Sequence, residues 1–424
     1  MIIDKSHLRW VILSALSGIL AGISSALFLL LLKFVTDYRV GHMQIIWGLP
    51  LTGLFIGFIY MRYGKSVNGG NNLIIDEIHD PQKIIPLRMA PLILLTTLLT
   101  HLFGGSAGRE GTAVQMGASL SDQLSKILRT SFKITNEERK ILLTAGAGAG
   151  FGAAIGAPIA GVFFGMEILN VGKLRIFALY QCVIASFVGT YVAVLLGAPH
   201  SVYNKVPSFH FELSSLFYII VSGIVFGLFS RLFCSVTHMV ENFNARFIKI
   251  TWLRPFFAGV ILVFLFNLEG TFIYAGLGLE TIMKAMNLPV DFHLPFYKLV
   301  ATSITVGSGF KGGEFIPLVF MGTTLGSAMS SIIPLSFNLL GALGFAAVFG
   351  AAANAPLSCA IMAAELFGPH IAFPALLCCF CAYYFSGYKG IYRSQKLMRK
   401  KHLGLLENIK WLGEIPGKFF RKKL

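Results

Sequence analysis

Long uncharged, apolar stretches are the feature that most constrains how this chain folds. They cover residues 10–32, 43–61, 89–108, 141–166, 176–204, 213–230, 255–267, 299–310, 315–364 and 366–388. A helix needs about 20 apolar residues to cross the hydrocarbon core of a bilayer, and several stretches reach that length. Only 13% of the residues are charged, 55% are hydrophobic and the mean hydropathy is +0.73. Because a soluble domain needs more charge on its surface, the sequence predicts an all-α integral membrane protein.

The charge that remains is concentrated at the C-terminus. The chain carries 35 Lys and Arg residues against 19 Asp and Glu, and 11 of the basic residues follow position 388. A basic run directly after an apolar segment is typical of a cytoplasmic tail held by the positive-inside rule, rather than of a nucleic-acid site. We therefore expect a multi-pass protein of the cell membrane with its C-terminus in the cytoplasm and no nucleic-acid partner.

Motifs for enzymatic chemistry are weak. Six cysteines lack metal-ligand spacing and read as packing thiols, and the ten histidines form no H-E-x-x-H pair. One G-x-S-x-G frame, at residues 104–108, lacks the strand that a nucleophile elbow requires. We expect no enzyme activity, no metal and no cofactor.

Two halves of the sequence resemble each other. Residues 108–112 (G-R-E-G-T) and 313–317 (G-E-F-I-P) are each followed by a Met-Gly pair, at an offset of 205. Residues 146–158 and 349–356 each end in Ala-Pro, with Glu167 and Glu365 nine residues after the proline. Short, glycine-interrupted segments at matching places predict two fused repeats with broken helices that meet near the membrane midplane. The spacing alone leaves parallel and inverted repeats open.

Acidic residues in apolar surroundings are functional candidates, because an unpaired carboxylate is costly inside a membrane. Glu110 and Glu314 follow glycine-rich turns that open apolar helices, where backbone N–H groups and the helix dipole favour an anion. The alternatives are that Glu110 caps its helix and pairs with Arg109, and that Glu314 pairs with Lys311. A third such turn lies at residues 69–74.

The glycine- and alanine-rich segments 146–165 and 341–364 are typical of close-packed helix faces. Glu167 and Glu365 end these segments. We expect them to be interfacial acids whose side chains reach toward the membrane surface.

Together these motifs resemble the CLC family of anion channels and anion/proton antiporters, over about residues 10–395. The family's three ion-binding loops, G-S-G-I-P, G-K/R-E-G-P and G-x-F-x-P, match residues 70–74, 108–112 and 313–317, and its late tyrosine matches Tyr392. The resemblance implies inverted repeats at 1–200 and 201–395, a basic tail at 396–424 without a regulatory domain, and a homodimer with one pathway per subunit.

The resemblance also assigns roles to single residues. It implies that Glu110 is the gate and proton acceptor, and an acid at Glu314 suggests a second proton site. The anion-binding residues that it implies are Gly70, Asn71, Asn72, Gly108, Arg109, Gly111, Thr112, Gly313, Phe315, Ile316 and Tyr392.

Several departures from the chloride pattern look like the fluoride-exporting bacterial branch. Asn71 replaces the family's serine, Thr112 replaces a proline, and Glu314 adds an acid to the third loop. The third motif is mixed, since Phe315 is as in chloride members and Ile316 replaces the branch's threonine. The internal proton-transfer glutamate of chloride exchangers falls at Ile168 and is absent.

These features predict a fluoride/proton antiporter that exports fluoride across the lipid bilayer. Asparagine amides suit fluoride, which needs strong donors to replace its water. The alternatives are a chloride/proton antiporter or passive chloride channel of the same fold, and an unrelated solute carrier.

Overall fold

The computed structural model describes residues 5–174, 176–208, 212–399 and 401, and most of them are helical. In chain order the α-helices are α1 (Lys5–Gly41), α2 (Leu49–Arg62), α3 (Asn71–His79), α4 (Met89–Leu102), α5 (Glu110–Ile127), α6 (Arg129–Phe132), α7 (Asn136–Ile155), α8 (Pro158–Glu167), α9 (Leu179–Leu195), α10 (Leu213–Phe247), α11 (Arg254–Glu269), α12 (Leu279–Asn287), α13 (His293–Gly307), α14 (Phe315–Met329), α15 (Phe337–Ala353), α16 (Pro356–Phe367) and α17 (Ala372–Phe385). Short 3₁₀ turns lie at Met43–Gly48, Lys65–Val67, Thr251–Leu253 and Pro369–Ile371. Two short parallel strands, β1 (Asn170–Val171) and β2 (Lys396–Leu397), pair with each other. The predicted tail beyond residue 401 lies outside the described residues.

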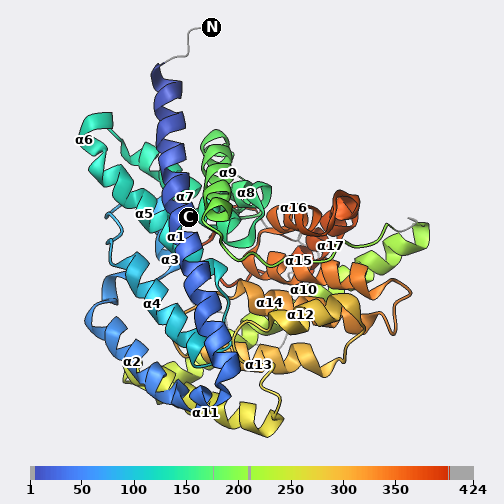
Figure 1. Ribbon diagram of the computed structural model, residues 1–424. Helices are drawn as coiled ribbons and strands as arrows, with labels where there is room; N and C mark the ends of the chain where they lie inside the picture. The colour runs from blue at the N-terminus through green and yellow to red at the C-terminus, as the bar shows by residue number, and fades with distance from the viewer. Residues whose placement is uncertain (1–4, 175, 209–211, 400, 402–424) are drawn as a thin grey trace.

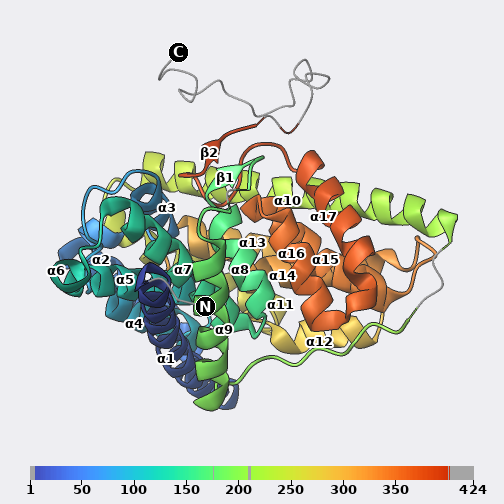
Figure 2. The same cartoon turned by 90° about the horizontal axis from the view of Figure 1, so that it is seen from above.

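The helices form two groups that follow the chain. Figure 1 shows α1 to α9 on one side and α12 to α17 on the other, and Figure 2 shows α10 along one edge of the second group. Among the described residues, four helical segments are long and apolar enough to cross a membrane: His7–Gly41, Met43–Arg62, Leu213–Phe247 and Thr251–Glu269. Most of the remaining apolar helices are shorter, as the mixed lengths in the sequence predict. The all-α membrane fold is confirmed.

Two of the long apolar stretches are broken where the sequence analysis drew them as single segments. Stretch 141–166 splits at Gly156, and stretch 315–364 splits twice, the second time at Asn354. Gly156 and Asn354 both adopt the left-handed backbone conformation, with φ of 81° and 55°, and end α7 and α15. A proline two residues later then opens the next helix. This combination ends one helix and starts another at a new angle.

The two repeats meet along an antiparallel contact. Gly108 N–H donates to the Gly313 carbonyl at 2.5 Å, and Gly313 N–H donates back to the Gly108 carbonyl at 2.8 Å. These two glycines occupy matching positions of the repeats. An antiparallel pairing of equivalent residues is what inverted repeats produce, and it places the second and third predicted loops side by side.

Glu167 and Glu365 provide a second, reciprocal contact, and here the sequence-based expectation is wrong. Glu167 accepts hydrogen bonds from the N–H groups of Leu357 and Ser358 at the start of α16, and Glu365 accepts them from Ile159 and Ala160 at the start of α8. Each acid therefore caps the other repeat's helix instead of reaching toward the membrane surface. The helix dipole and free N–H groups hold a carboxylate at this position better than the apolar lipid boundary does.

The glycine-rich faces pack as the sequence predicts. A side chain at Gly322 would clash with the Gly344 carbonyl oxygen, so α14 and α15 touch backbone to backbone. In the first repeat, a side chain at Gly117 would clash with the Gly146 carbonyl oxygen, where α5 meets α7. The six cysteines are free thiols, and five of them are fully buried.

Candidate functional site

A cavity of about 670 Å³ enters the protein where the predicted loops converge. Of the predicted site residues, Gly70, Asn71, Asn72, Glu314 and Tyr392 line it. They come from the start of α3, the turn before α14 and the segment that follows α17. The structure thus brings together residues separated by more than 300 positions in the sequence.

The first loop depends on a glycine that adopts an unusual backbone conformation. Gly70 has φ of 56° and ψ of −127°, in a region that L side chains rarely adopt, and it directly precedes α3. Asn71 and Asn72 are therefore the first residues of a helix. Asn72 N–H donates to the Gly69 carbonyl at 3.1 Å, so Asn71 N–H is the group at this helix start that can face an anion. Asn72 Oδ1 accepts a hydrogen bond from Ser394 N–H at 3.1 Å and ties the Tyr392 segment to this helix start.

The start of α5 lies close behind Asn71. A side chain at Gly111 would lie 3.1 Å from Asn71 Nδ2 and 3.1 Å from the Gly313 Cα, so only glycine lets these parts approach. Asn71 Oδ1 is buried and has no hydrogen-bond partner among the described residues. The Asn71 amide group is thus held at the junction of all three loops, with Gly108 and Gly313 paired beside it.

Glu110 is the first residue of α5 and is only 1% exposed. Its carboxylate accepts hydrogen bonds from Arg109 N–H at 3.2 Å and from Arg109 Nε at 3.1 Å. Arg109 in turn donates to Ser201 Oγ at 3.2 Å. Glu110 does not line the cavity. The carboxylate that the resemblance identifies as the gate is therefore not part of the cavity lining, and the ion pair with Arg109 that the alternative interpretation predicts is present.

The side chains of three predicted anion ligands contact other parts of the protein and not the cavity. Thr112 Oγ1 lies 2.9 Å from Thr97 Oγ1 of α4. Phe315 packs edge-on against Phe349, with ring centres 4.6 Å apart, and Ile316 is buried. Phe315 and Ile316 can offer an anion their backbone N–H groups, and the Ile316 N atom lies 3.0 Å from where a Gly108 side chain would be. Thr112 N–H instead donates to the Arg109 carbonyl at 3.1 Å.

Glu314 stands at the N-cap position of α14 and faces the cavity. Its expected partner, Lys311, points elsewhere: Lys311 Nζ donates to Asn68 Oδ1 at 2.8 Å and lies 4.0 Å from the centre of the Tyr60 ring. In the described part of the chain no ion pair involves Glu314. The alternative in which Glu314 only pairs with Lys311 is therefore not what the structure contains.

The cavity lining also contains several basic residues. Lys65, Arg254, Lys311 and Arg393 line it, and of these Arg393 is paired, with Glu241 of α10. The other three cations outnumber the unpaired acid Glu314. A cavity lined in this way concentrates anions at its mouth.

Sequence reasoning missed Gln115, which also lines the cavity. Its Nε2 and Oε1 atoms lie 3.3 and 3.4 Å from where a Gly70 side chain would be. Gln115 is one helical turn after Gly111, so it shares the α5 face that touches Asn71. That spacing is visible in the sequence, but only the packing of α3 against α5 shows that this face of α5 is the one that lines the cavity.

The position of the absent internal glutamate is filled by Ile168, which is buried. The neighbouring Glu167 points to α16, so its carboxylate does not substitute for the missing one. Among the described residues no group of three or more His, Cys, Asp or Glu side chains is arranged to hold a metal ion.

Comparison with known proteins places the chain among anion transporters. Residues 52–387 match the family model described as "Voltage gated chloride channel". A "Chloride/fluoride channel protein" from Pseudomonas syringae pv. tomato is 43% identical over 93% of this chain and 88% of its own length. An H(+)/Cl(−) exchange transporter from Klebsiella pneumoniae is 26% identical, over 86% and 82%.

Solved structures agree with this assignment. The crystal structure of a CLC-type fluoride/proton antiporter covers 93% of this chain with a TM-score of 0.89 and 31% identity, over 99% of that chain. A slow cyanobacterial Cl⁻/H⁺ antiporter shares the fold, with a TM-score of 0.77, 21% identity, and coverage of 91% and 96%. The matched family model spans all three loops and their surrounding helices, and the chain is a member of the CLC (voltage-gated chloride channel) family of membrane transport proteins.

Proposed function

We propose that this protein is a fluoride/proton antiporter that exports fluoride. The observation that carries the proposal is the Asn71 amide, held against Gly111 where three helix starts converge. Fluoride is small and strongly hydrated, so it needs several good donors in place of its water. Helix N–H groups and an asparagine amide supply such donors without a cation that would trap the ion. Both the 43% identical relative and the 31% identical antiporter bear fluoride in their names.

The coupling follows from competition between an anion and Glu110 for the same helix start. An ionised carboxylate at the start of α5 occupies the charge-stabilised position that an entering anion needs. When Glu110 takes up a proton, its charge is lost and the anion can advance. Proton and anion then move in opposite directions, because each step of one requires displacement of the other.

The cavity supplies the path to this point from one side of the membrane. An anion drawn in by the basic rim first meets Asn71 and Tyr392, with Glu110 beyond them. Glu314 lines the same path and is a carboxylate without an ion-pair partner among the described residues. We propose that it carries protons along this path in place of the glutamate that Ile168 replaces.

The experiment is ion efflux from proteoliposomes loaded with fluoride or with chloride, with an ion-selective electrode and a pH electrode outside. We expect fluoride efflux to drive proton uptake into the vesicles, and chloride efflux to be much slower. Chloride-driven proton movement at an equal or higher rate identifies a chloride/proton antiporter. Anion efflux without proton movement identifies a channel.

Chloride transport is the second candidate, and Phe315 favours it as the residue of chloride members. In the structure the Phe315 ring packs against Phe349, so only its N–H group is available to an ion. The presence of phenylalanine at position 315 is therefore a weak argument for chloride over fluoride.

Three further features belong to the proposal. We propose a homodimer with one pathway in each subunit, repeats at 1–200 and 201–395 followed by the basic tail, and a cytoplasmic C-terminus. The positive-inside rule supports the orientation. It makes the described cavity cytoplasmic, because Tyr392 and Arg393, which line it, precede the tail.

A further inference from the structure

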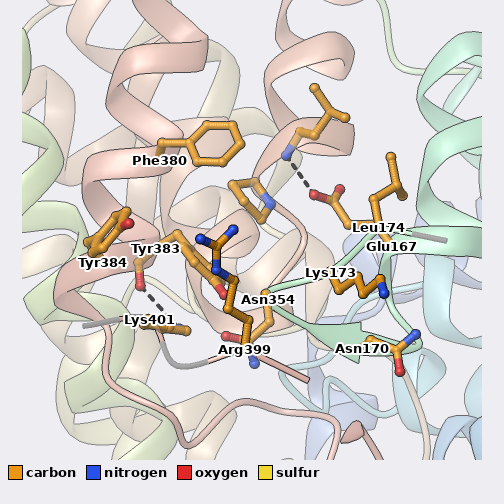
Figure 3. Close-up of a pocket in the computed structure, with 13 residues that line it drawn as sticks. Glu167, Asn170, Lys173, Leu174, Asn354, Phe380, Tyr383, Tyr384, Arg399 and Lys401 are labelled. Atoms are coloured by element: carbon orange, nitrogen blue, oxygen red, sulfur yellow. Dashed lines mark hydrogen bonds between the residues drawn. The ribbon is translucent and has the colours of Figure 1, made fainter. Parts of the chain in front are cut away.

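A second cavity, of about 360 Å³, lies apart from the transport path (Figure 3). It is formed where α8 and α17 end and where β1 and β2 pair, at the side of the molecule that carries the C-terminal segment (Figure 2). None of the predicted site residues lines it. Among the described residues, its lining includes three cations, Lys173, Arg399 and Lys401, and one acid, Glu167.

The strand pairing sets two of these cations side by side along the backbone. Asn170 pairs with Lys396 and Val171 with Leu397, so Lys173 and Arg399 stand at matching positions just past the two strands. The two segments approach each other closely here. A side chain at Gly172, whose φ is 81°, would lie only 2.6 Å from the Arg399 carbonyl oxygen, so glycine is needed at this position. In Figure 3 the Arg399 guanidinium extends into the cavity beside Tyr383.

Neither exposed cation has an acidic partner. Among the described residues no ion pair involves Lys173 or Arg399. The one acid of the lining, Glu167, is already bound by two N–H groups and the Ser358 hydroxyl at the start of α16. Cations without acidic partners attract an anion to the cavity that they line.

Lys401, the third cation of the lining, is used in hydrogen bonds within the protein. Its ammonium group donates to the carbonyl oxygens of Tyr383 and Gly387 and to Ser386 Oγ. It therefore fastens the segment after β2 to the end of α17. Burial lowers the pKa of Lys401 to about 7. Lys401 thus serves the packing of this segment, and Lys173 and Arg399 are the basic residues of the lining that remain for a ligand.

Two buried amides add unused polar atoms. Asn170 is 2% exposed, and neither Oδ1 nor Nδ2 of its side chain has a partner among the described residues. Asn354 donates to Gln395 Oε1, but its own Oδ1 has no partner in that part of the chain. Buried polar groups without partners are rare in folded proteins and mark places where a ligand or water completes the hydrogen bonding.

The other wall of the cavity is apolar and continues onto the outside of the helices. Phe380 and Tyr384 of α17 line the cavity and are also exposed, and the exposed Ile176 and Phe177 follow Leu174 on the other side. We propose that this cavity binds the phosphate group of an anionic phospholipid, with Lys173 and Arg399 as its cationic ligands. The acyl chains lie along the apolar surface of α17, which a free phosphate ion would leave uncovered.

The experiment is thermal unfolding of the full-length protein in a neutral detergent, titrated with dioctanoyl phosphatidylglycerol. A ligand that binds only the folded state raises the unfolding temperature. We expect a saturable rise for the wild type. In the double variant Lys173→Gln/Arg399→Gln the half-saturating concentration increases roughly tenfold or more, as expected for lost hydrogen bonds between charged groups. The matched control is Lys396→Gln, which removes one exposed charge from β2 outside the cavity and keeps the wild-type response.

Other titrations separate the source of the ligand. An equal rise with dioctanoyl phosphatidylcholine, or an unchanged phosphatidylglycerol response in the double variant, overturns the proposal. An equal rise with inorganic phosphate at the same concentration identifies a soluble-anion site and also overturns it. If the double variant does not fold, the single variants Lys173→Gln and Arg399→Gln, both at exposed positions, give the same comparison with smaller shifts.

Discussion

Glu110 is the residue on which coupling depends in the proposed mechanism. Glutamine has nearly the same shape but cannot ionise, so Glu110→Gln keeps the α5 start folded and removes the group that competes with the anion. We expect proton movement to stop while anion efflux continues. Fluoride and pH electrodes on the same proteoliposomes measure both. Fluoride-driven proton uptake at the wild-type rate in this variant disproves the role of Glu110.

Asn71 is the side chain that we expect to distinguish fluoride. Replacement by alanine removes one amide donor to a charged ion, a loss of about 1.5–3 kcal/mol, or roughly ten- to a hundredfold in relative affinity. The ratio of fluoride to chloride efflux rates in Asn71→Ala measures the change. Asn242→Ala is the matched control, because Asn242 lines the same cavity away from the loops. A wild-type ratio in Asn71→Ala contradicts the assignment.

The variant Glu314→Gln tests the proposed proton path separately from the role of Glu110. A carboxylate facing the anion path repels anions unless it is protonated or passes a proton on. In Glu314→Gln we expect proton-coupled transport to fall sharply while fluoride binding, measured by calorimetry, persists. Lys311→Gln is the comparison, since Lys311 bonds to Asn68 and not to Glu314. Coupled antiport at full rate in Glu314→Gln would reduce this acid to a structural residue.

At the scale of elements, the contacts that join the two repeats lie at the N-terminal ends of helices. The Gly108–Gly313 pairing, beside the site, and the reciprocal bonds of Glu167 and Glu365 hold the two halves together. Helix starts are suited to this because their N–H groups lack partners within the helix. The same property that lets three helix starts face an anion thus also fastens the scaffold around them.

The two capping acids, Glu167 and Glu365, are expected to contribute unequally to the free energy of unfolding. Glu167 is buried and accepts three hydrogen bonds, whereas Glu365 is partly exposed and accepts two from the start of α8. Loss of a helix cap costs about 0.5–2 kcal/mol, and we expect Glu167→Gln to lie at the upper end and Glu365→Gln at the lower. Thermal unfolding in detergent measures both. Glu212 lies at the exposed start of α10, where its side chain accepts from the Ser214 hydroxyl but caps no backbone N–H of the helix, so Glu212→Gln should change stability by less than about 0.5 kcal/mol. Equal values for the three variants would contradict the capping role.

At the scale of the whole molecule, all three loops, Tyr392 and the cavity come from one chain. A complete pathway in each subunit predicts that subunits of the proposed homodimer work independently. In tandem-linked dimers with one wild-type and one Glu110→Gln subunit, we expect half the proton flux of the wild-type dimer. Electrode measurements on these dimers give the ratio. Complete loss of proton flux would show that the subunits share one pathway.

The sequence by itself determined the membrane environment, the two repeats and the glycine-opened helix starts. These follow from local properties: apolar length, charge distribution, and glycine and proline positions, which act within a few residues. Family membership, found from the motifs, is confirmed by the comparisons. The roles of Glu110, Asn71 and Glu314 stay predictions.

Only the tertiary structure decided where the acids point and which face of each helix meets the site. The spacing of Glu167 and Glu365 from a proline does not show that each caps a helix about 200 residues away. Gln115 faces the cavity because α5 docks on α3. Lys173 and Arg399 stand at matching backbone positions because two strands that are far apart in the sequence pair with each other. Contacts between distant segments depend on how whole helices pack. Helix packing is decided by the fit of many side chains at once, and no local pattern in the sequence records that fit.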